Sequence, residues 1–251
     1  MAGSMRWLNA DIIRGKSKRR GICVAAARPA VIVRASMIVA VAIFLVLPGC
    51  RDPEKPQAIW LETGSGPAQV VYPRAIAYRP QDRSFVVIDR MARVQRIDAA
   101  GKFITGWRMP DWERGKPVGV SVGPDGDIYV PDTHYHRVIV YSPDGVERRR
   151  WGRFGRGPGE FIFPTDVAFD RRGRILVSEY GEHDRIQVFD SAGNYLTEFG
   201  RFGHGDGEFS RPQSIVVAGE LVYVADSCNH RIVVFDLDGN WRKNLGAVGT
   251  G

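Results

Sequence analysis

Histidines are the residues of this 251-residue chain best suited to hold a metal ion or to transfer a proton near neutral pH. There are five: His134, His136, His183, His204 and His230. No two of them form an H-x-x-x-H pair, the spacing that places two zinc ligands on one helical face. The pattern therefore predicts no metal site and no cofactor. No Ser-His-Asp set or paired-carboxylate motif predicts a catalytic residue either.

The cysteines predict neither a metal site nor a disulfide framework. Cys23 and Cys50 lie in the first fifty residues, and only Cys228 lies beyond them. A single cysteine excludes an intrachain disulfide in that later part of the chain, and the spacing fits no zinc knuckle.

Two glycine-rich stretches nearly repeat each other and raise the question of phosphate binding. They read WGRFGRGPGEFIFP at 151–164 and FGRFGHGDGEFSRP at 199–212. A phosphate-binding loop needs a strand, a loop and a helix in that order, with a Lys-Ser or Lys-Thr pair, and neither stretch has them. We interpret the stretches as joints between repeated structural units, in which glycines supply backbone conformations of positive φ.

The repeat is marked by four prolines, Pro73, Pro117, Pro164 and Pro212, which are spaced 44, 47 and 48 residues apart. Each proline opens a unit of four short apolar or mixed runs separated by turns such as GPDGD. Short runs of β-branched and aromatic residues between such turns predict strands in antiparallel hairpins. Four strands in about 46 residues is the size of one blade of a β-propeller.

The predicted fold is therefore all-β, a propeller of four-stranded antiparallel blades at about 73–107, 117–152, 164–200 and 212–246. Blades stacked face to face bury sheet surfaces that one blade alone would leave exposed. Residues 60–73 match the joint at 151–164 position for position, so we expect an orphan fourth strand at the start of a propeller domain spanning 60–251. Four blades and one orphan strand, ending inside a joint, predict an incomplete ring.

Residues that recur in every unit are expected to maintain the fold. An acid ends the second strand of each unit and an arginine begins the third; they are Asp89, Asp132, Glu179 and Asp226, with Arg93, Arg137, Arg185 and Arg231. A carboxylate at a strand end can accept backbone N–H groups, and an arginine can brace a neighbouring segment. His136 and His230 share one repeat position, so we expect them to brace loops as well.

The net charge of +7 lies entirely in the N-terminal segment, because residues 51–251 hold 27 charges of each sign. There a basic stretch, RGKSKRR, precedes the uncharged run 35–47, which is too short to cross the bilayer core as a helix. We interpret residues 1–50 as a signal or anchor segment and 51–59 as a linker. The ending LPGC resembles a bacterial lipobox, which would make Cys50 the lipidated residue of an exported protein tethered to the cell envelope, on the periplasmic or outer side of a membrane.

The later repeats carry a family resemblance. DTHYHRVIVYSPDG and DSCNHRIVVFDLDG, with joints of the form G-x-G-x-G-E-F-x-x-P, resemble NHL repeats over residues 60–251. The resemblance implies a propeller, commonly of six blades. Asp184 stands where the motif has histidine, and the first unit lacks the Asn-His pair, so we expect its blade to be degenerate.

The candidate binding residues lie on the propeller face that carries the joints. Loops between second and third strands emerge on this face, and they are the longer and more variable ones, where binding residues usually lie. The irregular residues there are Trp107, Trp112, His134, Tyr135, Glu182, His183, His204, Asp206 and Cys228. Trp112, in a shortened joint, either forms an aromatic ligand surface with Tyr135 or plugs the seam between blades.

We expect a binding or scaffold module for a protein, peptide or glycan. Propellers related to NHL repeats include zinc-dependent amidating lyases. Resemblance to that group would imply a zinc or calcium ion held by histidines near the propeller axis. Because most of the histidines fall in outer-to-middle loops, we do not expect them to converge. Some propellers of the family bind RNA through a basic face, but a charge-neutral domain behind an export signal argues against nucleic acid as the partner.

Overall fold

The computed structural model describes residues 58–246. The predictions on the signal or anchor segment, on Cys50 and on most of the linker lie outside these residues. No helix within 58–246 has the length and apolarity needed to span a membrane. The described chain is built of strands, with two single-turn 3-10 helices, η1 (Thr133–Tyr135) and η2 (Ser227–Asn229).

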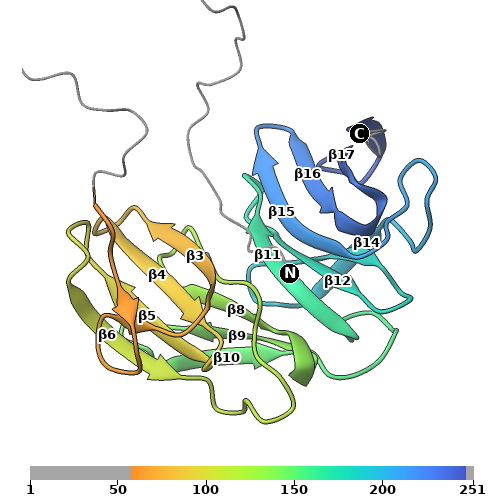
Figure 1. Cartoon of the computed structure of the whole chain (residues 1–251). Coiled ribbons are helices and arrows are strands. Elements are labelled where there is room, and N and C mark those ends of the chain that lie inside the picture. The colour runs from red at the N-terminus through yellow and green to blue at the C-terminus, as the bar shows by residue number, and fades with distance from the viewer. Residues whose placement is uncertain (1–57, 247–251) are drawn as a thin grey trace, which may run out of the picture. The chain divides into compact units, whose positions relative to one another are not determined.

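Each predicted unit forms one antiparallel sheet whose four strands are neighbours in chain order (Figure 1). The first blade contains β3 (Pro73–Arg79), β4 (Ser84–Asp89), β5 (Arg93–Ile97) and β6 (Phe103–Arg108). The second contains β7 (Ser121–Val122), β8 (Ile128–Asp132), β9 (Arg137–Tyr141) and β10 (Glu147–Trp151). The third contains β11 (Phe163–Phe169), β12 (Ile175–Tyr180), β13 (Arg185–Phe189) and β14 (Tyr195–Phe199). The fourth contains β15 (Pro212–Ala218), β16 (Leu221–Asp226), β17 (Arg231–Asp236) and β18 (Trp241–Leu245). The predicted fold of four-stranded propeller blades is confirmed.

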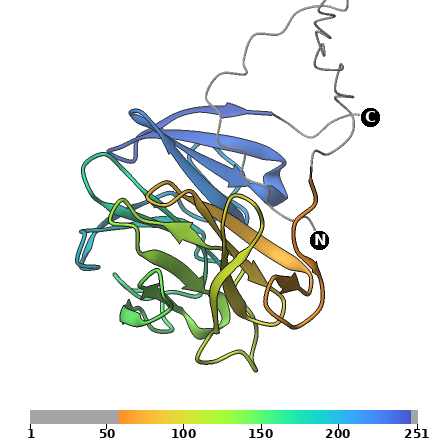
Figure 2. The ribbon, with the colours of Figure 1, turned by 90° about the vertical axis from the view of Figure 1, so that its left-hand side faces the viewer.

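The hydrophobic core is divided among the seams between consecutive blades, which follow one another from orange to blue in Figures 1 and 2. The seam of blades 2 and 3 contains Phe161 and Phe189, and the seam of blades 3 and 4 contains Phe209 and Phe235. These four rings are fully buried. Alternating residues of each strand therefore face the two neighbouring blades, as in stacked sheets generally.

Aromatic rings from the fourth strands of blades 1 to 3, and from Trp60 ahead of blade 1, pack on a turn glycine of the blade that follows. Trp107 covers Gly145, and Trp151 covers Gly193, where an added Cβ would lie 3.2 Å from the indole. Phe199 covers Gly239 in the same way, and Trp60 covers Gly101. These glycines have φ between 83° and 91°, so a side chain would be strained there as well as crowded.

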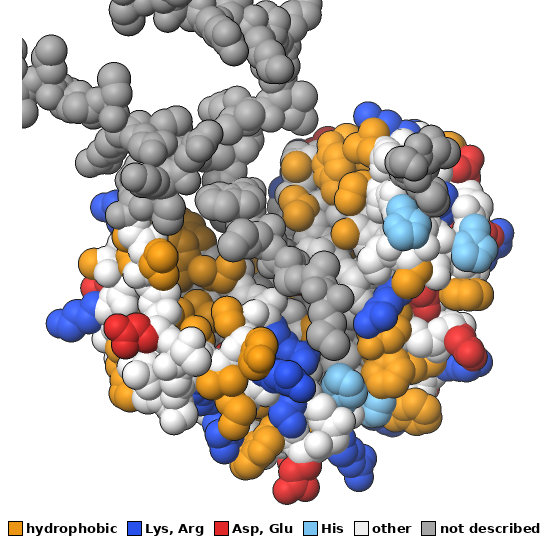
Figure 3. All heavy atoms as spheres, in the orientation of Figure 1, with side chains coloured by type: hydrophobic (Ala, Val, Ile, Leu, Met, Phe, Trp, Pro, Cys, Tyr) orange, Lys and Arg blue, Asp and Glu red, His pale blue; other side chains and the backbone are white. Residues whose placement is uncertain are grey.

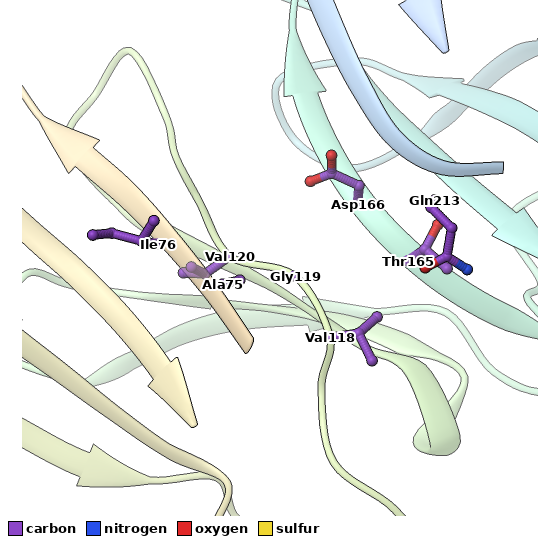
Figure 4. A pocket seen from close by; sticks show the side chains of 8 residues that line it. All are labelled: Ala75, Ile76, Val118, Gly119, Val120, Thr165, Asp166 and Gln213. Atoms are coloured by element: carbon purple, nitrogen blue, oxygen red, sulfur yellow. The ribbon is translucent and has the colours of Figure 1, made fainter. Parts of the chain in front are cut away.

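The first strands of the blades contact one another around the axis. Figure 4 shows a narrow pocket there, lined by residues of all four blades, among them Ala75, Gly119, Asp166 and Gln213. The carboxylate of Asp166 accepts hydrogen bonds from Ser214 Oγ and the Ile215 N–H, both at 2.9 Å. We assign this buried carboxylate the role of tying blade 3 to blade 4.

The predicted orphan fourth strand appears only as the joint that follows it. Within residues 58–72, β1 (Glu62–Thr63) pairs in parallel with β2 (Gln69–Val70), and residues 58–61 lie outside any strand. The bridges Phe154–Phe161 and Phe202–Phe209 repeat this pairing in the later joints. A fourth strand needs a third strand of its own blade as a partner, and no described strand offers that edge to residues 58–61.

Candidate binding face

The joints and the loops between second and third strands lie together on one face of the propeller, which we call the joint face. Direct hydrogen bonds connect them: the Arg90 N–H donates to Val71 O at 3.0 Å, and the Cys228 N–H donates to Ser210 O at 3.0 Å. His136 Nδ1 contacts Ile162 O in the next joint. A ligand on this face would therefore contact joints and loops at once.

Three of the four joints are fastened by the recurring acid and arginine. The buried carboxylates of Asp89, Glu179 and Asp226 each accept the N–H of the residue two positions before the blade's proline, at 3.1, 2.7 and 2.6 Å. The arginine beside each carboxylate donates to carbonyl oxygens of the same joint; Arg231 Nη2, for example, bonds Gly205 O at 2.7 Å and Glu208 O at 2.9 Å. We call this arrangement of hydrogen bonds the latch.

The glycine-rich joints satisfy their own backbone rather than an anion. Glu160 Oε2 accepts the Gly157 N–H at 2.9 Å, and Glu208 Oε2 accepts the Gly205 N–H at 2.8 Å. The Gly157 hydrogen bond is the main cause that lowers the pKa of Glu160. The chain's own carboxylate thus fills the place that a phosphate would take in an anion-binding loop.

The joint of blade 2, residues 109–117, has no such latch. Arg137 Nε donates to Asp132 Oδ2 at 2.9 Å, but its Nη2 donates to the carboxylate of Asp111 at 2.5 Å rather than to joint carbonyls. Burial raises the pKa of Asp132 to about 6, with Arg137 opposing the rise. Blade 2 therefore departs from the repeat at the place where several predicted binding residues lie.

The predicted aromatic surface of Trp112 and Tyr135 is not formed as one unit. The guanidinium carbon of Arg108 lies 4.8 Å from the centroid of the Trp112 ring, and Trp112 packs partly against the seam of blades 1 and 2. Tyr135 carries Arg137 at 5.2 Å, and its hydroxyl accepts the Arg114 N–H at 3.0 Å. No ring contact joins the two within the described chain. The arrangement agrees with a seam plug for Trp112.

The remaining predicted residues are scattered over the joint face. Trp107 packs in the seam over Gly145 and against Tyr141, so it contributes to the core rather than to a surface. Glu182 is exposed and lies 3.8 Å from Arg156. Asp206 accepts from Asn244 at 2.8 Å.

The five histidines differ in burial and in their contacts. His136 and His230 both adopt left-handed backbone at the ends of η1 and η2. His204 Nδ1 lies 2.6 Å from Asn229 Oδ1, and burial lowers the pKa of His183 and of His134. Across residues 58–246, no three His, Cys, Asp or Glu side chains gather into a possible metal-binding group.

Asp184, which replaces the motif histidine, still connects its blade to the next joint. Its carboxylate accepts the Arg211 N–H at 2.5 Å and the Gly181 N–H at 3.0 Å. His136 reaches a joint carbonyl from the same repeat position, so the substitution reverses donor and acceptor but keeps the bridge.

Two exposed phenylalanines on the joint face were not predicted as binding residues. Phe154 is 68% exposed and Phe202 is 52% exposed, although both stand beside fully buried partners, Phe161 and Phe209. His136 lies edge-on to Phe154 at 4.9 Å. Figure 3 shows histidine side chains beside exposed hydrophobic ones on the surface in view. The sequence does hold a signal, because Thr63 fills the same position in the first joint and shows that the joint folds without an aromatic residue there.

Comparison with known proteins identifies the repeat. A profile for the 6-bladed beta-propeller matches residues 170–246, and a profile for the NHL repeat matches residues 115–141. Protein brain tumor of Drosophila melanogaster is 28% identical over 133 residues, which are 52% of this chain and 12% of that protein. NHL repeat-containing protein 3 of Homo sapiens is 34% identical over 100 residues, which are 39% of this chain and 28% of that protein. The chain thus spans less than a third of either relative's length.

Solved structures share the fold at low identity. A streptogramin B lyase is 15% identical with a TM-score of 0.56, over 71% of this chain and 55% of that one. A chain of a nidogen/laminin complex is 17% identical with a TM-score of 0.56, over 70% of this chain and 64% of that one. At such identities the likeness shows architecture and not activity. Both profiles fall on the blades, so the described residues form a β-propeller that carries an NHL repeat.

Proposed function

We propose that this propeller is a recognition module that binds a protein partner through its joint face. The observation that carries the proposal is the exposure of Phe154 and Phe202 at equivalent positions of adjacent joints. Each ring leaves apolar surface in water although the joint does not need it, and aromatic residues are the usual anchors of protein interfaces.

The surroundings of the two rings fit a protein interface. His136, which contacts Phe154, also contacts Phe163 at 5.9 Å. The ring of Phe163 stacks on Tyr180 at 5.1 Å, and Arg211 lies over Tyr180 at 5.1 Å. Arginine and aromatic residues are enriched at interfaces because they combine large contact area with directed hydrogen bonding. One solved neighbour comes from a complex of two proteins, nidogen and laminin, which supports the use of this fold in protein recognition.

The test is a comparison of matched variants. Purified full-length protein is used to capture partners from extracts of the cells that make it, alongside Phe154→Ala/Phe202→Ala and the control Val146→Ala. Val146 is 66% exposed but lies in a hairpin turn on the opposite face. We expect the Phe variant to lose the captured protein at least tenfold and the control to retain it. Equal capture by both variants would refute the role of Phe154 and Phe202 as anchors. Capture of a glycan and no protein would contradict a protein partner.

We also propose export and tethering to the cell envelope through Cys50, as the N-terminal sequence indicates. Mass spectrometry of the membrane fraction is expected to find a lipidated peptide beginning at Cys50, and Cys50→Ala is expected to move the protein to the soluble exported fraction. Unprocessed protein with Met1 in the cytosol would contradict this.

A metal-dependent lyase is the alternative function, supported by the likeness to streptogramin B lyase and to virginiamycin B lyase of Staphylococcus aureus. Stoichiometric zinc or calcium in purified protein would favour it. Metal-free protein that retains its partner would favour recognition.

A further inference from the structure

Blade 2 leaves three consecutive residues of the joint face with buried polar atoms that have no hydrogen-bond partner. They are Asp132 Oδ1, Thr133 Oγ1 and His134 Nδ1. Asp132 is 0% exposed and Thr133 is 1% exposed. An unpaired buried polar atom costs free energy, and such a group calls for a partner that the folded chain does not supply.

The other blades show which partners belong at these positions. The acid equivalent to Asp132 accepts a joint N–H in each of them, for example from Ile162 to Glu179 at 2.7 Å. Ser227, equivalent to Thr133, donates its hydroxyl to Arg211 O at 2.8 Å. Both partners are main-chain groups of the joint. The unfilled positions in blade 2 therefore match a peptide backbone.

The chain's own joint is too short to fill them. Pro117 follows Trp107 by 10 residues, whereas Pro164 follows Trp151 by 13. Elsewhere the first strand pairs from its proline onward, as Pro164 does with Glu179, but β7 pairs only through Ser121 and Val122.

Pro131 contributes to this loss of pairing. It stands in β8 where the third and fourth blades have Ser178 and Ala225, and proline has no N–H for a ladder. The edge of β8 next to Asp132 is consequently left without its first-strand neighbour.

The joint that covers this edge is weakly held. The joint at 152–163 makes three internal backbone hydrogen bonds, from Gly155 to Phe161 O, Glu160 to Gly157 O and Phe161 to Arg153 O. Residues 110–117, all of them described, make none. Their polar contacts run through side chains, such as Lys116 Nζ to Trp112 O at 2.7 Å. Segments with few backbone hydrogen bonds open at low free-energy cost.

We propose that blade 2 carries a docking site for an extended peptide segment, which donates a main-chain N–H to Asp132 Oδ1 and accepts the Thr133 hydroxyl at a carbonyl when joint 109–117 moves aside. The inference rests on the proposed function, since a protein partner supplies the segment, but it concerns a separate set of residues from Phe154 and Phe202. The peptide would replace the chain's own joint beside β8, with its main-chain groups bonded to the side chains of Asp132 and Thr133.

The probe is a fluorescently labelled synthetic peptide with the sequence of residues 157–165, GPGEFIFPT, in which the Ile162 N–H makes the contact with the acid within blade 3. It is titrated into the full-length protein and followed by anisotropy. The matched control carries an N-methyl group on the amide that corresponds to Ile162, which removes the donor alone. We expect saturable binding of the first peptide and at least tenfold weaker binding of the second.

Thr133→Val locates the site and guards against misfolding. Because the Thr133 hydroxyl has no partner, the valine variant is expected to keep the melting temperature while losing peptide affinity several-fold. Thr165→Val is the contrasting variant, because Thr165 Oγ1 lies 2.7 Å from Ser178 Oγ and donates to Pro212 O at 2.9 Å, so its melting temperature is expected to fall.

Three results would overturn the inference: no binding at millimolar peptide, equal binding of the N-methylated peptide, or unchanged affinity in Thr133→Val. A crystal structure in which one water molecule hydrogen-bonds to both Asp132 and Thr133 would explain an absence of peptide binding. The variant Phe154→Ala/Phe202→Ala distinguishes the two proposals. If it still binds the peptide but loses the protein partner, both proposals stand independently. If it keeps the protein partner, the proposed function fails, whatever the peptide result.

Discussion

The joints at 152–163 and 109–117 connect equivalent blades by different means. The first is fastened at its backbone, by Glu179 and Arg185 from the blade it enters and by Glu160 from within. The second is held by side chains, chiefly Asp111 on Arg137. Both blades remain packed, because their seams bury comparable sets of aliphatic and aromatic residues. The seams therefore maintain the propeller, while the latch fixes the shape of the joint face.

The strongest test of this division compares two phenylalanines of one joint. Phe161→Ala removes a fully buried ring from the seam and is expected to lower the free energy of unfolding by about 3–5 kcal/mol. Phe154→Ala, at 68% exposure, is expected to change it by less than about 0.5 kcal/mol. Urea denaturation of the two variants measures both values. Equal destabilisation would show that Phe154 belongs to the fold rather than to a surface.

The latch itself is tested by two equivalent arginines. Arg185→Ala removes the cation paired with the buried Glu179 carboxylate and one hydrogen bond to each of two joint carbonyls, so a loss of about 3 kcal/mol is expected. Arg137→Ala breaks the pairs with Asp132 and Asp111 and the contact with the Tyr135 ring, and protonation of Asp132 can relieve the loss, so about 1 kcal/mol is expected. Chemical denaturation at pH 6 compares them. A larger effect at Arg137 would mean that blade 2 is fastened by contacts equivalent to the latch.

The unfastened blade should also respond to pH. Burial raises the pKa of Asp132 from 3.8 to about 6, so the folded state holds this proton more tightly than the unfolded state. The stabilisation is present below about pH 4 and is lost as pH rises through 6, by about 2 kcal/mol in order of magnitude. Asp132→Asn removes it, so the stability of the wild type relative to the variant should fall between pH 4 and 7. A constant difference across that range would contradict the raised pKa.

The smallest effect is expected inside a latched joint. Glu160→Gln keeps an oxygen that accepts the Gly157 N–H, as Gln69 does for Gly66 at 3.0 Å in the first joint. It loses only the pair with Arg153, whose side chain is 81% exposed, so the cost should stay below about 0.5 kcal/mol. Thermal unfolding decides, and a loss above about 1.5 kcal/mol would show that charge, not hydrogen bonding, maintains the joint.

The repeat could be predicted from sequence because it is written in strand-length runs and turns that recur four times. The acid and arginine were placed correctly in their blades for the same reason, since position in a repeat implies position in space. The rule for residues that recur in every unit does not cover Phe154 and Phe202, which occupy equivalent positions in two joints only and are exposed.

Other features depended on distances that the sequence does not display. Asp166 occurs in one blade only, yet its role is defined by Ser214 and Ile215 of the next blade. Pro131 was visible inside a predicted strand, but its effect on β7 required the pairing of two strands to be known. Trp107 was predicted as a binding residue, but it occupies a position that is aromatic in several units. The rule for recurring residues would therefore have assigned it to the fold.

The packing of each fourth-strand aromatic on the next blade's turn glycine gives the propeller a direction. A blade's last strand is fully covered only when the following blade has formed its outer hairpin. The stability of each repeat therefore depends on the repeat that follows it. Damage at Gly193 would accordingly be detected around Trp151, in a blade whose own sequence is intact.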